Sequence, residues 1–455
     1  MLLSRKYIQI NDKIIIGLSG GPDSVYLAYL MNWLKAEYNL ELILAHVNYK
    51  LRGEESDADE QYCREFAGSL GLPVDVLISD LSAQKTTNGN VQNSAREIRM
   101  SFFCQLAVKH DCHKIALAHT ADDNIETVLG NILRGCGLAG LSGIVEKSES
   151  IIRPLLHVSK AEIVEFLNDK QIDYRVDSSN LSNEYTRNKI RNDLIPHLKE
   201  VYNPEIESAI SRLSRISSEV HEYLLYLTVD FIKKQVAYSN LDSAIIPIEA
   251  LTEMNPVIIR MVIKYLTEYV ANKKRGLAAF DRIDDALKLI GAETGVKSDL
   301  GGNLMCERGK DCLIIFRNGR KIEECIPQIP GKTDLPGFNL VLHSVIEQKT
   351  NDIAYSDDNR TIYLDYDKLS PEFSVRQFES GDRFQPLGMN GSKKLGDFFT
   401  DRGIPGALRM EIPVLVNVGD IVWVLGEEIS ELFKVDQSTE TILKLWIEKI
   451  VRKAE

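Results

Sequence analysis

The sequence has no run of apolar residues near the ~18 that a membrane span requires, and its first residues, MLLSRKYIQINDK, lack the uninterrupted apolar core of a secretion signal. We therefore expect a cytoplasmic protein with no membrane partner. Cysteine is scarce as well, since seven cysteines are scattered over 455 residues and none forms a C-x-x-C pair. An odd and dispersed set argues against a disulfide framework and against a zinc or iron–sulfur cluster.

The chain also lacks an excess of positive charge, because its formal net charge at pH 7 is −12. This deficit counts against a nucleic-acid partner, since neutralisation of phosphates supplies much of the affinity for one. Basic residues nevertheless cluster locally, with five Lys or Arg against two acids over 85–114, four against one over 187–199, and seven against four over 260–288. Each run is compatible with an ordinary solvated face or with local contact to RNA phosphates.

The composition, with 44% hydrophobic and 26% charged residues, is that of an ordinary globular protein. The length of 455 residues suggests about three domains at ~150 residues each. In its first part, apolar runs alternate with segments of helical periodicity. We expect strands at 13–18, 42–47, 74–78 and 114–119, and helices at 25–35, 57–70, 91–109 and 122–133. This alternation predicts an α/β fold with a doubly wound parallel sheet.

The pattern changes near residue 200. Helical periodicity dominates 204–227 and 256–290, and β-like runs follow at 312–316, 340–345, 361–364 and finally 421–425, which we expect to close the fold. We predict three domains: an α/β catalytic domain at 1–200, a mainly helical middle domain at 201–325, and a small mixed α/β C-terminal domain at 326–455 with a core from about residue 374.

A glycine-rich turn joins the first predicted strand to the first predicted helix. It consists of Ser19, Gly20, Gly21, Pro22, Asp23 and Ser24. In such a turn, backbone N–H groups and the positive end of the helix converge on one point, which suits a polyphosphate. The lysine of G-x-x-x-x-G-K-[ST] is absent, so this is not the usual loop for transfer of a γ-phosphate. A carboxylate such as Asp23 beside phosphates suits a magnesium ligand.

A second polar cluster follows the fourth predicted strand, in the stretch AHTADDNIET at 118–127. Asp123 and Glu126 are three residues apart at the start of a helix, so both carboxylates can face one side. They could bind magnesium or accept a proton. Capping of the helix by Asp122 or Asp123, with an acidic first turn, explains the same residues equally well. The spacing leaves both interpretations open.

The turn Ser19–Ser24 resembles the loop of the PP-loop, or N-type ATP pyrophosphatase, superfamily. This resemblance implies that ATP is cleaved between its α and β phosphates and that AMP is attached to an oxygen. It does not choose the substrate, because tRNA thiolases, GMP synthetases, asparagine synthetases and tRNA lysidine synthetases look alike here.

Further segments narrow the resemblance: HVNYKLR at 46–52, AREIR at 95–99, DSSN at 177–180, RNKIR at 187–191, GDRFQPLGM at 381–389 and GSKKLGDFF at 391–399. Together they resemble the bacterial tRNA(Ile)-lysidine synthetases over nearly the whole chain. Two positions depart from that family's pattern. Tyr49 stands where a second histidine is common, which weakens a catalytic role there, and Met100 stands where an aromatic residue is common.

The resemblance implies a ligase that attaches free L-lysine to C2 of the wobble cytidine of a tRNA(Ile) with a CAU anticodon. ATP first adenylates the C2 oxygen, and the ε-amine of lysine then displaces AMP, so that the products are lysidine, AMP and pyrophosphate. Codon reading changes from AUG to AUA. ATP and Mg²⁺ are the implied cofactors, and the C-terminal domain is expected to bind the tRNA. The oligomeric state stays open, a homodimer included.

The residues expected to act in catalysis are Asp23, Asp123, Glu126, Arg96 and Arg99. Of these, Asp23 and Asp123 are the expected magnesium ligands. Asp123 or Glu126 could hold the lysine ammonium. The two arginines could neutralise the charge on pyrophosphate. The expected ATP contacts are Ser19, Gly20, Gly21, Pro22, Asp23, Ser24, His46 and His119. The expected tRNA contacts are Arg187, Lys189, Arg191, Lys393 and Lys394. Alternatively, Arg96 and Arg99 could form exposed salt bridges on a helix face. His46 and His119 could lie at the edge of the core and bond only to the backbone.

Three other functions compete. A PP-loop tRNA 2-thiolase would be expected to use catalytic cysteines or a cluster, and the absence of C-x-x-C counts against it. An amidotransferase-type synthetase would need a glutaminase domain or partner, and no such nucleophile signature is visible. A non-catalytic tRNA-binding protein would explain the basic runs but would leave Asp23 and its loop without a purpose.

Overall fold

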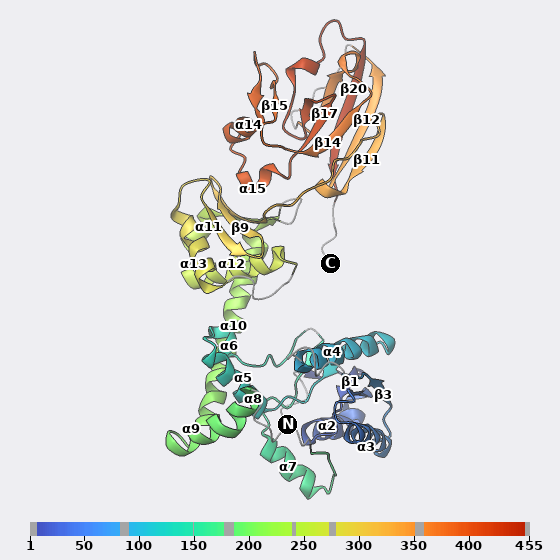
Figure 1. Ribbon diagram of the computed structural model, residues 1–455, viewed down its shortest axis with the longest axis vertical. Helices are drawn as coiled ribbons and strands as arrows, with labels where there is room; N and C mark the ends of the chain where they lie inside the picture. The colour runs from blue at the N-terminus through green and yellow to red at the C-terminus, as the bar shows by residue number, and fades with distance from the viewer. Residues whose placement is uncertain are drawn as a thin grey trace. The chain divides into compact units, whose positions relative to one another are not determined.

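The computed structural model describes residues 7–81, 91–148, 150–176, 186–238, 243–272, 279–350 and 359–450. The chain forms two compact units, Met1–Tyr223 and Leu224–Glu455. Figure 1 shows the first unit in blue to green and the second in yellow-green to red. No helix in the described ranges is long and apolar enough to cross a membrane.

A five-stranded parallel sheet forms the centre of the first unit. Its strands run in the order β3-β2-β1-β4-β5, and every neighbouring pair is parallel. They are β1 (Lys13–Gly17), β2 (Glu41–Asn48), β3 (Val74–Ile78), β4 (Lys114–Ala116) and β5 (Ile151–Ile152). The alternation of strands and helices in the sequence predicted β1 to β4 but not the two-residue β5, and the doubly wound α/β fold is confirmed.

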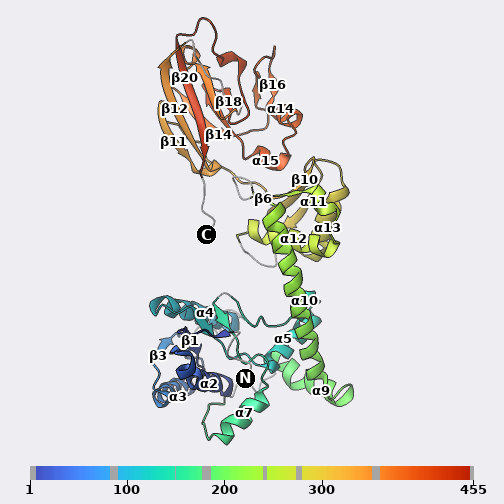
Figure 2. The same cartoon turned by 180° about the vertical axis from the view of Figure 1, so that it is seen from behind.

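Helices cover both faces of the sheet, since successive strand residues point to opposite sides. α2 (Pro22–Tyr38), α3 (Glu54–Leu70) and α7 (Lys160–Asp169) share a core with Ile14 and Ile16 of β1. On the other face, α4 (Val91–Lys109) packs Phe103 against a core that contains Ile15. Figure 2 shows α4 on one side of β1 and both α2 and α3 on the other, as Figure 1 does from the opposite direction.

A helical extension completes the first unit. Its elements are α5 (Ala121–Leu133), α6 (Leu138–Leu141), α8 (Thr186–Lys189), a π-helical turn (Ile190–Leu194), α9 (Ile195–Val201) and the first part of α10 (Ile206–Gln235). These elements enclose a small separate core of Ile125, Val128, Leu129, Ile190, Ile195 and Ile210. The shared core places α8 and the following turn against α5.

The first part of the second unit combines helices with an antiparallel sheet. α11 (Ile248–Thr252), α12 (Pro256–Val270) and α13 (Phe280–Lys288) pack with the end of α10 on a sheet of order β6-β7-β10-β9-β8. Its strands are β6 (Ala237–Tyr238), β7 (Ala244–Pro247), β8 (Lys297–Gly301), β9 (Leu304–Arg308) and β10 (Cys312–Arg317). Most of α10, together with α12, α13 and β10, was predicted, but α11 was not. The other four strands are short and show no clear alternation of apolar and polar residues, so the sequence did not reveal them.

The second part of this unit packs two antiparallel sheets on one core, which includes Val375, Trp423 and Leu443. One sheet has the order β11-β12-β20-β13 and contains β11 (Gly331–Leu335), β12 (Leu340–Gln348), β13 (Thr361–Asp365) and β20 (Thr441–Lys449). The other has the order β14-β17-β18-β19 and contains β14 (Phe373–Gln377), β17 (Pro413–Asn417), β18 (Asp420–Val424) and β19 (Glu428–Ile429). Our expectation that 421–425 closes the fold is wrong, because β20 follows and pairs with both β12 and β13.

Replacing Phe103 by Ala is expected to destabilise the first unit by about 3–5 kcal/mol, because it removes a buried aromatic ring and leaves a cavity between α4 and β1. Val108→Ala on the same helix serves as the control, since Val108 is 86% exposed and its truncation should change stability by less than about 0.5 kcal/mol. Denaturant unfolding followed by circular dichroism measures both variants. Equal effects of the two substitutions would contradict this packing of α4.

Candidate active site

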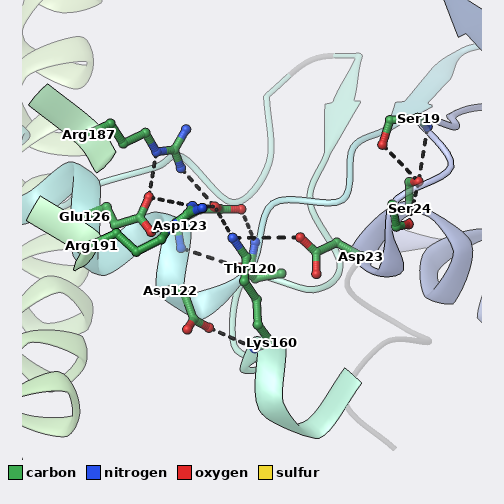
Figure 3. Close-up of polar contacts among 11 residues, drawn as sticks. Ser19, Asp23, Ser24, Thr120, Asp122, Asp123, Glu126, Lys160, Arg187 and Arg191 are labelled. Carbon is green, nitrogen blue, oxygen red and sulfur yellow. Dashed lines mark hydrogen bonds and ion pairs between the residues drawn. The ribbon is translucent and has the colours of Figure 1, made fainter. Parts of the chain in front are cut away.

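The candidate site lies at the carboxyl ends of β1 and β4. β1 has β2 on one side and β4 on the other, so the strand order reverses there. Doubly wound sheets bind their ligands at such a point. The segment after β1 leads into α2, and the segment after β4 leads into α5. The two segments that the sequence singled out are therefore adjacent, and Figure 3 shows Asp23 facing Thr120 and Lys160.

Ser24 organises the phosphate loop, Ser19–Ser24. Its hydroxyl accepts hydrogen bonds from the backbone N–H and from the hydroxyl of Ser19, both at 3.1 Å, and donates one to the carbonyl of Gly21 at 2.9 Å. Gly20 has a φ of +86°, a conformation that favours glycine. α2 begins at Pro22, within this loop, so its first backbone N–H groups have no partner within the helix. This geometry suits an anion.

Asp23, in the first turn of α2, is a strongly perturbed carboxylate. Burial raises the pKa of Asp23 to about 6, against the opposing effect of Lys160 and with the help of the Asp123 and Asp122 charges. Lys160 Nζ lies 3.9 Å from Asp23 Oδ2. Asp23 Oδ1 is buried and has no hydrogen-bond partner in the part of the chain that the structure describes. Since a buried oxygen without a donor is unfavourable, this atom is suited to meet a cation.

Asp123 combines the two interpretations that its spacing left open. Its Oδ2 accepts the backbone N–H of Thr120 at 2.9 Å, and Thr120 Oγ1 accepts the N–H of Asp123 in return, which closes a capping box at the start of α5. Its Oδ1 lies 3.2 Å from Lys160 Nζ and 2.9 Å from Arg187 Nη2. Burial works to raise the pKa of Asp123, but Lys160, Arg187 and the hydrogen bond from the Thr120 backbone together lower it. Thr120, rather than Asp122 or Asp123, is therefore the N-cap residue, and Asp123 completes its capping box while also facing the site as a carboxylate.

Glu126 is bound by two arginines. It is 3% exposed, one turn further along α5. Arg187 Nε donates to Glu126 Oε2 at 2.6 Å, Arg191 Nη2 donates to the same oxygen at 3.1 Å, and Arg191 Nε donates to Oε1. Figure 3 shows these contacts on one side of Asp123 and Lys160 on the other. The predicted tRNA contacts Arg187 and Arg191 thus lie at the acidic cluster, where they neutralise it.

The two candidate histidines are both perturbed by burial. His46 Nδ1 lies 2.9 Å from the carbonyl oxygen of Leu18 and 3.4 Å from Cys63 Sγ, and burial lowers the pKa of His46. His119 Nδ1 accepts a hydrogen bond from Arg153 Nε at 3.3 Å. Burial, followed by Arg153, lowers the pKa of His119 to about 4. Both imidazoles are therefore neutral at pH 7 and bind through hydrogen bonds rather than charge.

Arg96 and Arg99 come from α4, on the opposite face of the sheet from α2. After burial and Arg153, the charge of Arg99 contributes to the lowered pKa of His119. Burial also lowers the pKa of Arg153, and the nearby charge of Arg96 lowers it further. Arg99 Nε is buried without a hydrogen-bond partner among the described residues. Arg99 therefore lies near His119 after β4, and Arg96 lies near Arg153 after β5.

The other predicted residues lie apart from this centre. Lys189 is exposed on α8. Lys393 pairs with Asp401, and Lys394 lies opposite Arg383 in the two-stranded ribbon β15 (Arg383–Phe384) and β16 (Lys393–Lys394) of the second unit. The segment DSSN at 177–180 lies outside the described residues.

Sequence reasoning missed two cations of the site. Lys160 is brought to Asp123 because Ser159 and Glu162 form a capping box at the start of α7 and Asp122 Oδ2 accepts the backbone N–H of Lys160 at 2.8 Å. The pattern S-x-x-E at 159–162 signals the start of this helix. Arg153 follows β5, and nothing in its local sequence marked it.

The protein class follows from comparison with known families. Residues 3–198 match the PP-loop domain, and residues 373–446 match the TilS substrate C-terminal domain. The phosphate loop and the Asp123 cluster both fall within the first match. The expected PP-loop fold is confirmed, and use of ATP follows from this class.

Curated relatives match almost the full length. The tRNA(Ile)-lysidine synthase of Caldanaerobacter subterraneus subsp. tengcongensis is 34% identical over 444 residues, which cover 96% of this chain and 94% of that one. The tRNA(Ile)-lysidine synthase of Clostridium tetani is 34% identical over 461 residues, and that of Parabacteroides distasonis is 34% identical over 439. The chain belongs to the tRNA(Ile)-lysidine synthase family.

Replacing Asp23 by Asn is expected to stabilise the ligand-free protein near neutral pH. Because the pKa of Asp23 is raised on folding to about 6, the folded chain binds more protons than the unfolded chain between about pH 4 and 6, and its stability falls as pH rises through that window. The gain from Asp23→Asn is therefore absent near pH 4 and reaches at most about 3 kcal/mol above pH 6.

Denaturant titrations at about pH 4 and pH 7.5 measure this gain. Asp169→Asn, which removes an exposed acid at the end of α7, is the matched control. A gain for Asp23→Asn that is equal at both pH values would show that the carboxylate is not perturbed.

Proposed function

We propose that the chain ligates free L-lysine to C2 of the wobble cytidine of CAU-anticodon tRNA(Ile), through an adenylated tRNA intermediate. The observation that carries this proposal is the phosphate loop facing the Asp123–Glu126 cluster across the switch point, in a chain whose relatives are named tRNA(Ile)-lysidine synthases. In the first step the C2 oxygen attacks the α-phosphorus and pyrophosphate leaves. In the second step the lysine ε-amine attacks C2, the C2–O bond breaks and AMP leaves.

The phosphate loop holds the triphosphate in this proposal. Gly20 and Gly21 let the backbone approach closely, and the first N–H groups of α2 meet the negative charge. Ser19 and Ser24 add hydroxyls, although each is already bonded within the loop. Arg96 and Arg99, at the end of β4, offset the charge that gathers on the departing pyrophosphate. His46 and His119 line the nearby strand ends as neutral hydrogen-bonding groups.

Asp23 and Asp123 are the proposed magnesium ligands, and their chemistry fits. Asp23 Oδ1 is a buried oxygen without a donor, and hard oxygen ligands are those that Mg²⁺ prefers. No group of three or more His, Cys, Asp or Glu side chains among the described residues is arranged to hold a metal alone. Mg²⁺ usually takes one or two carboxylates together with phosphate oxygens and water, so this agrees with binding as an ATP complex. When bound, the ion neutralises the phosphates and polarises them.

The acidic cluster is the proposed site of the substrate lysine. Asp123 already accepts an ammonium group, since Lys160 Nζ lies 3.2 Å from its Oδ1. Because cations lower the pKa of Asp123, this acid is better suited to hold an ammonium than to remove its proton, whereas two arginines already occupy Glu126. We infer that Asp123 serves the two steps in turn, as a magnesium ligand in adenylation and as the group that binds the ε-ammonium afterwards, and that the proton leaves to solvent before attack.

The tRNA contacts are proposed to divide between the two units. Lys189 is exposed on α8, and Lys394 is exposed in the second unit. Arg187 and Arg191 are partly engaged by Glu126, so they would meet RNA while still neutralising the cluster. Lys393 would first have to leave Asp401. The second unit's contribution agrees with its match to the TilS substrate C-terminal domain.

The direct test incubates the purified chain with ATP, Mg²⁺, labelled lysine and a CAU-anticodon tRNA(Ile) transcript. Label is expected in the RNA, with one AMP and one pyrophosphate formed for each lysine. A transcript with adenosine at the wobble position, which has no C2 oxygen, is the control and should accept no label. Label that reaches both transcripts, or neither, would contradict the assignment.

Asp23→Ala should lower AMP formation at least about 100-fold, because it removes a proposed ligand of the ATP complex from the reacting phosphates. tRNA affinity should stay within about twofold, because no tRNA contact is proposed for Asp23. Pyrophosphate release and tRNA filter binding measure the two effects, with Asp169→Asn as the matched exposed variant. Loss of tRNA binding or of cooperative unfolding in Asp23→Ala would indicate a structural role instead.

A further inference from the structure

Gly20 of the phosphate loop is held from outside the loop. Its carbonyl accepts a hydrogen bond from the backbone N–H of Arg175 at 2.9 Å. A Cβ atom at Gly20 would lie 3.4 Å from Tyr62 Cδ1, 3.4 Å from Cys63 Sγ and 3.5 Å from Arg175 Cγ. This glycine therefore packs between α3 and the segment around residue 175, in addition to its own strand and helix.

Asp59 connects these two supports. It lies on α3, three and four residues before Tyr62 and Cys63, and therefore on the same side of the helix. Each of its carboxylate oxygens accepts a hydrogen bond from a different arginine. Oδ1 accepts one from Arg175 Nε at 2.9 Å, and Oδ2 accepts one from Arg52 Nη2 at 2.7 Å. The Asp59 side chain is 13% exposed. Partial burial makes such charge-assisted hydrogen bonds stronger than those of a fully solvated pair.

The segment before Arg175 is attached to α3 at a second point, because the hydroxyl of Tyr62 donates to the carbonyl of Asp173. Three contacts therefore run from α3 through 173–175 to the phosphate loop. Without the carboxylate of Asp59, Arg52 and Arg175 would be neighbouring like charges with no shared acid between them. Their repulsion would act on Arg175, whose backbone N–H holds the Gly20 carbonyl.

We propose that Asp59 is a positioning residue for the phosphate loop. By pairing with Arg175 it keeps the Gly20 carbonyl in place, and so it fixes the direction of the backbone N–H groups that follow and receive the ATP phosphates. The proposal rests on the proposed function only in that Ser19–Ser24 binds ATP. It involves neither lysine nor tRNA, so ATP binding measured alone tests it.

Asp59→Asn in the full chain keeps the size of the side chain and removes its charge. The Kd and the KM for ATP are expected to rise about tenfold, the effect of weakening one charge-assisted hydrogen bond, while kcat and the KM for lysine stay within about threefold. Asp59→Glu should recover part of the affinity. Glu65→Gln is the matched control, since it removes an exposed acid of the same helix whose carboxylate accepts from Gln61, and it should leave ATP affinity unchanged.

A double-mutant cycle tests the route of the effect. Arg175→Ala should weaken ATP binding as much as Asp59→Asn, and the two together should be no worse than either alone, because both break the same connection. An Asp59→Asn chain that binds ATP as tightly as the unchanged chain overturns the proposal. So do additive effects, or a loss of kcat and thermal stability in step with ATP affinity. An unchanged chain that binds ATP but transfers no lysine refutes the proposed function and leaves this proposal standing.

Discussion

Carboxylates removed from water must be matched by cations, and this constraint shapes the first unit. Asp23, Asp123 and Glu126 gather at the carboxyl edge of the sheet, where an unmatched charge would cost several kcal/mol. The matching charges come from Lys160 on α7 and from the two arginines of RNKIR at 187–191. Both segments lie well beyond the acids in sequence. α7 and α8 therefore have to return to this edge, and the small core around Ile125 and Ile190 holds α8 there.

The matching is uneven across the site. Glu126 receives three hydrogen bonds from two arginines, Asp123 shares its outer oxygen between Lys160 and Arg187, and Asp23 retains a buried oxygen with no donor in the described residues. Negative charge is thus neutralised by the protein at the end next to α8 and is incompletely neutralised at the end next to the phosphate loop. This gradient places the need for an added cation at the end next to the phosphate loop, where Asp23 lies.

Local sequence patterns predicted the features that are local in the fold. The loop at Ser19–Ser24, the helix at 91–109 and the strand at 74–78 were predicted from neighbouring residues alone, and the structure has the last two with the same bounds. Contacts between distant residues were not predicted: Arg187 meets Glu126 across 61 positions, and no motif joins Lys160 to Asp123. In the second unit, β7 to β9 are short strands whose pairing depends on sheet partners rather than on their own composition.

The order in which the site's parts occur along the chain has a consequence for synthesis on the ribosome. The phosphate loop and the acids emerge first, but the arginines that neutralise Glu126 arrive only with residues 187–191. Domains generally form as units as they leave the ribosome. Until residue 191 has emerged, Glu126 of the nascent first unit lacks the arginines that neutralise it, so the acidic cluster is completed later than the phosphate loop.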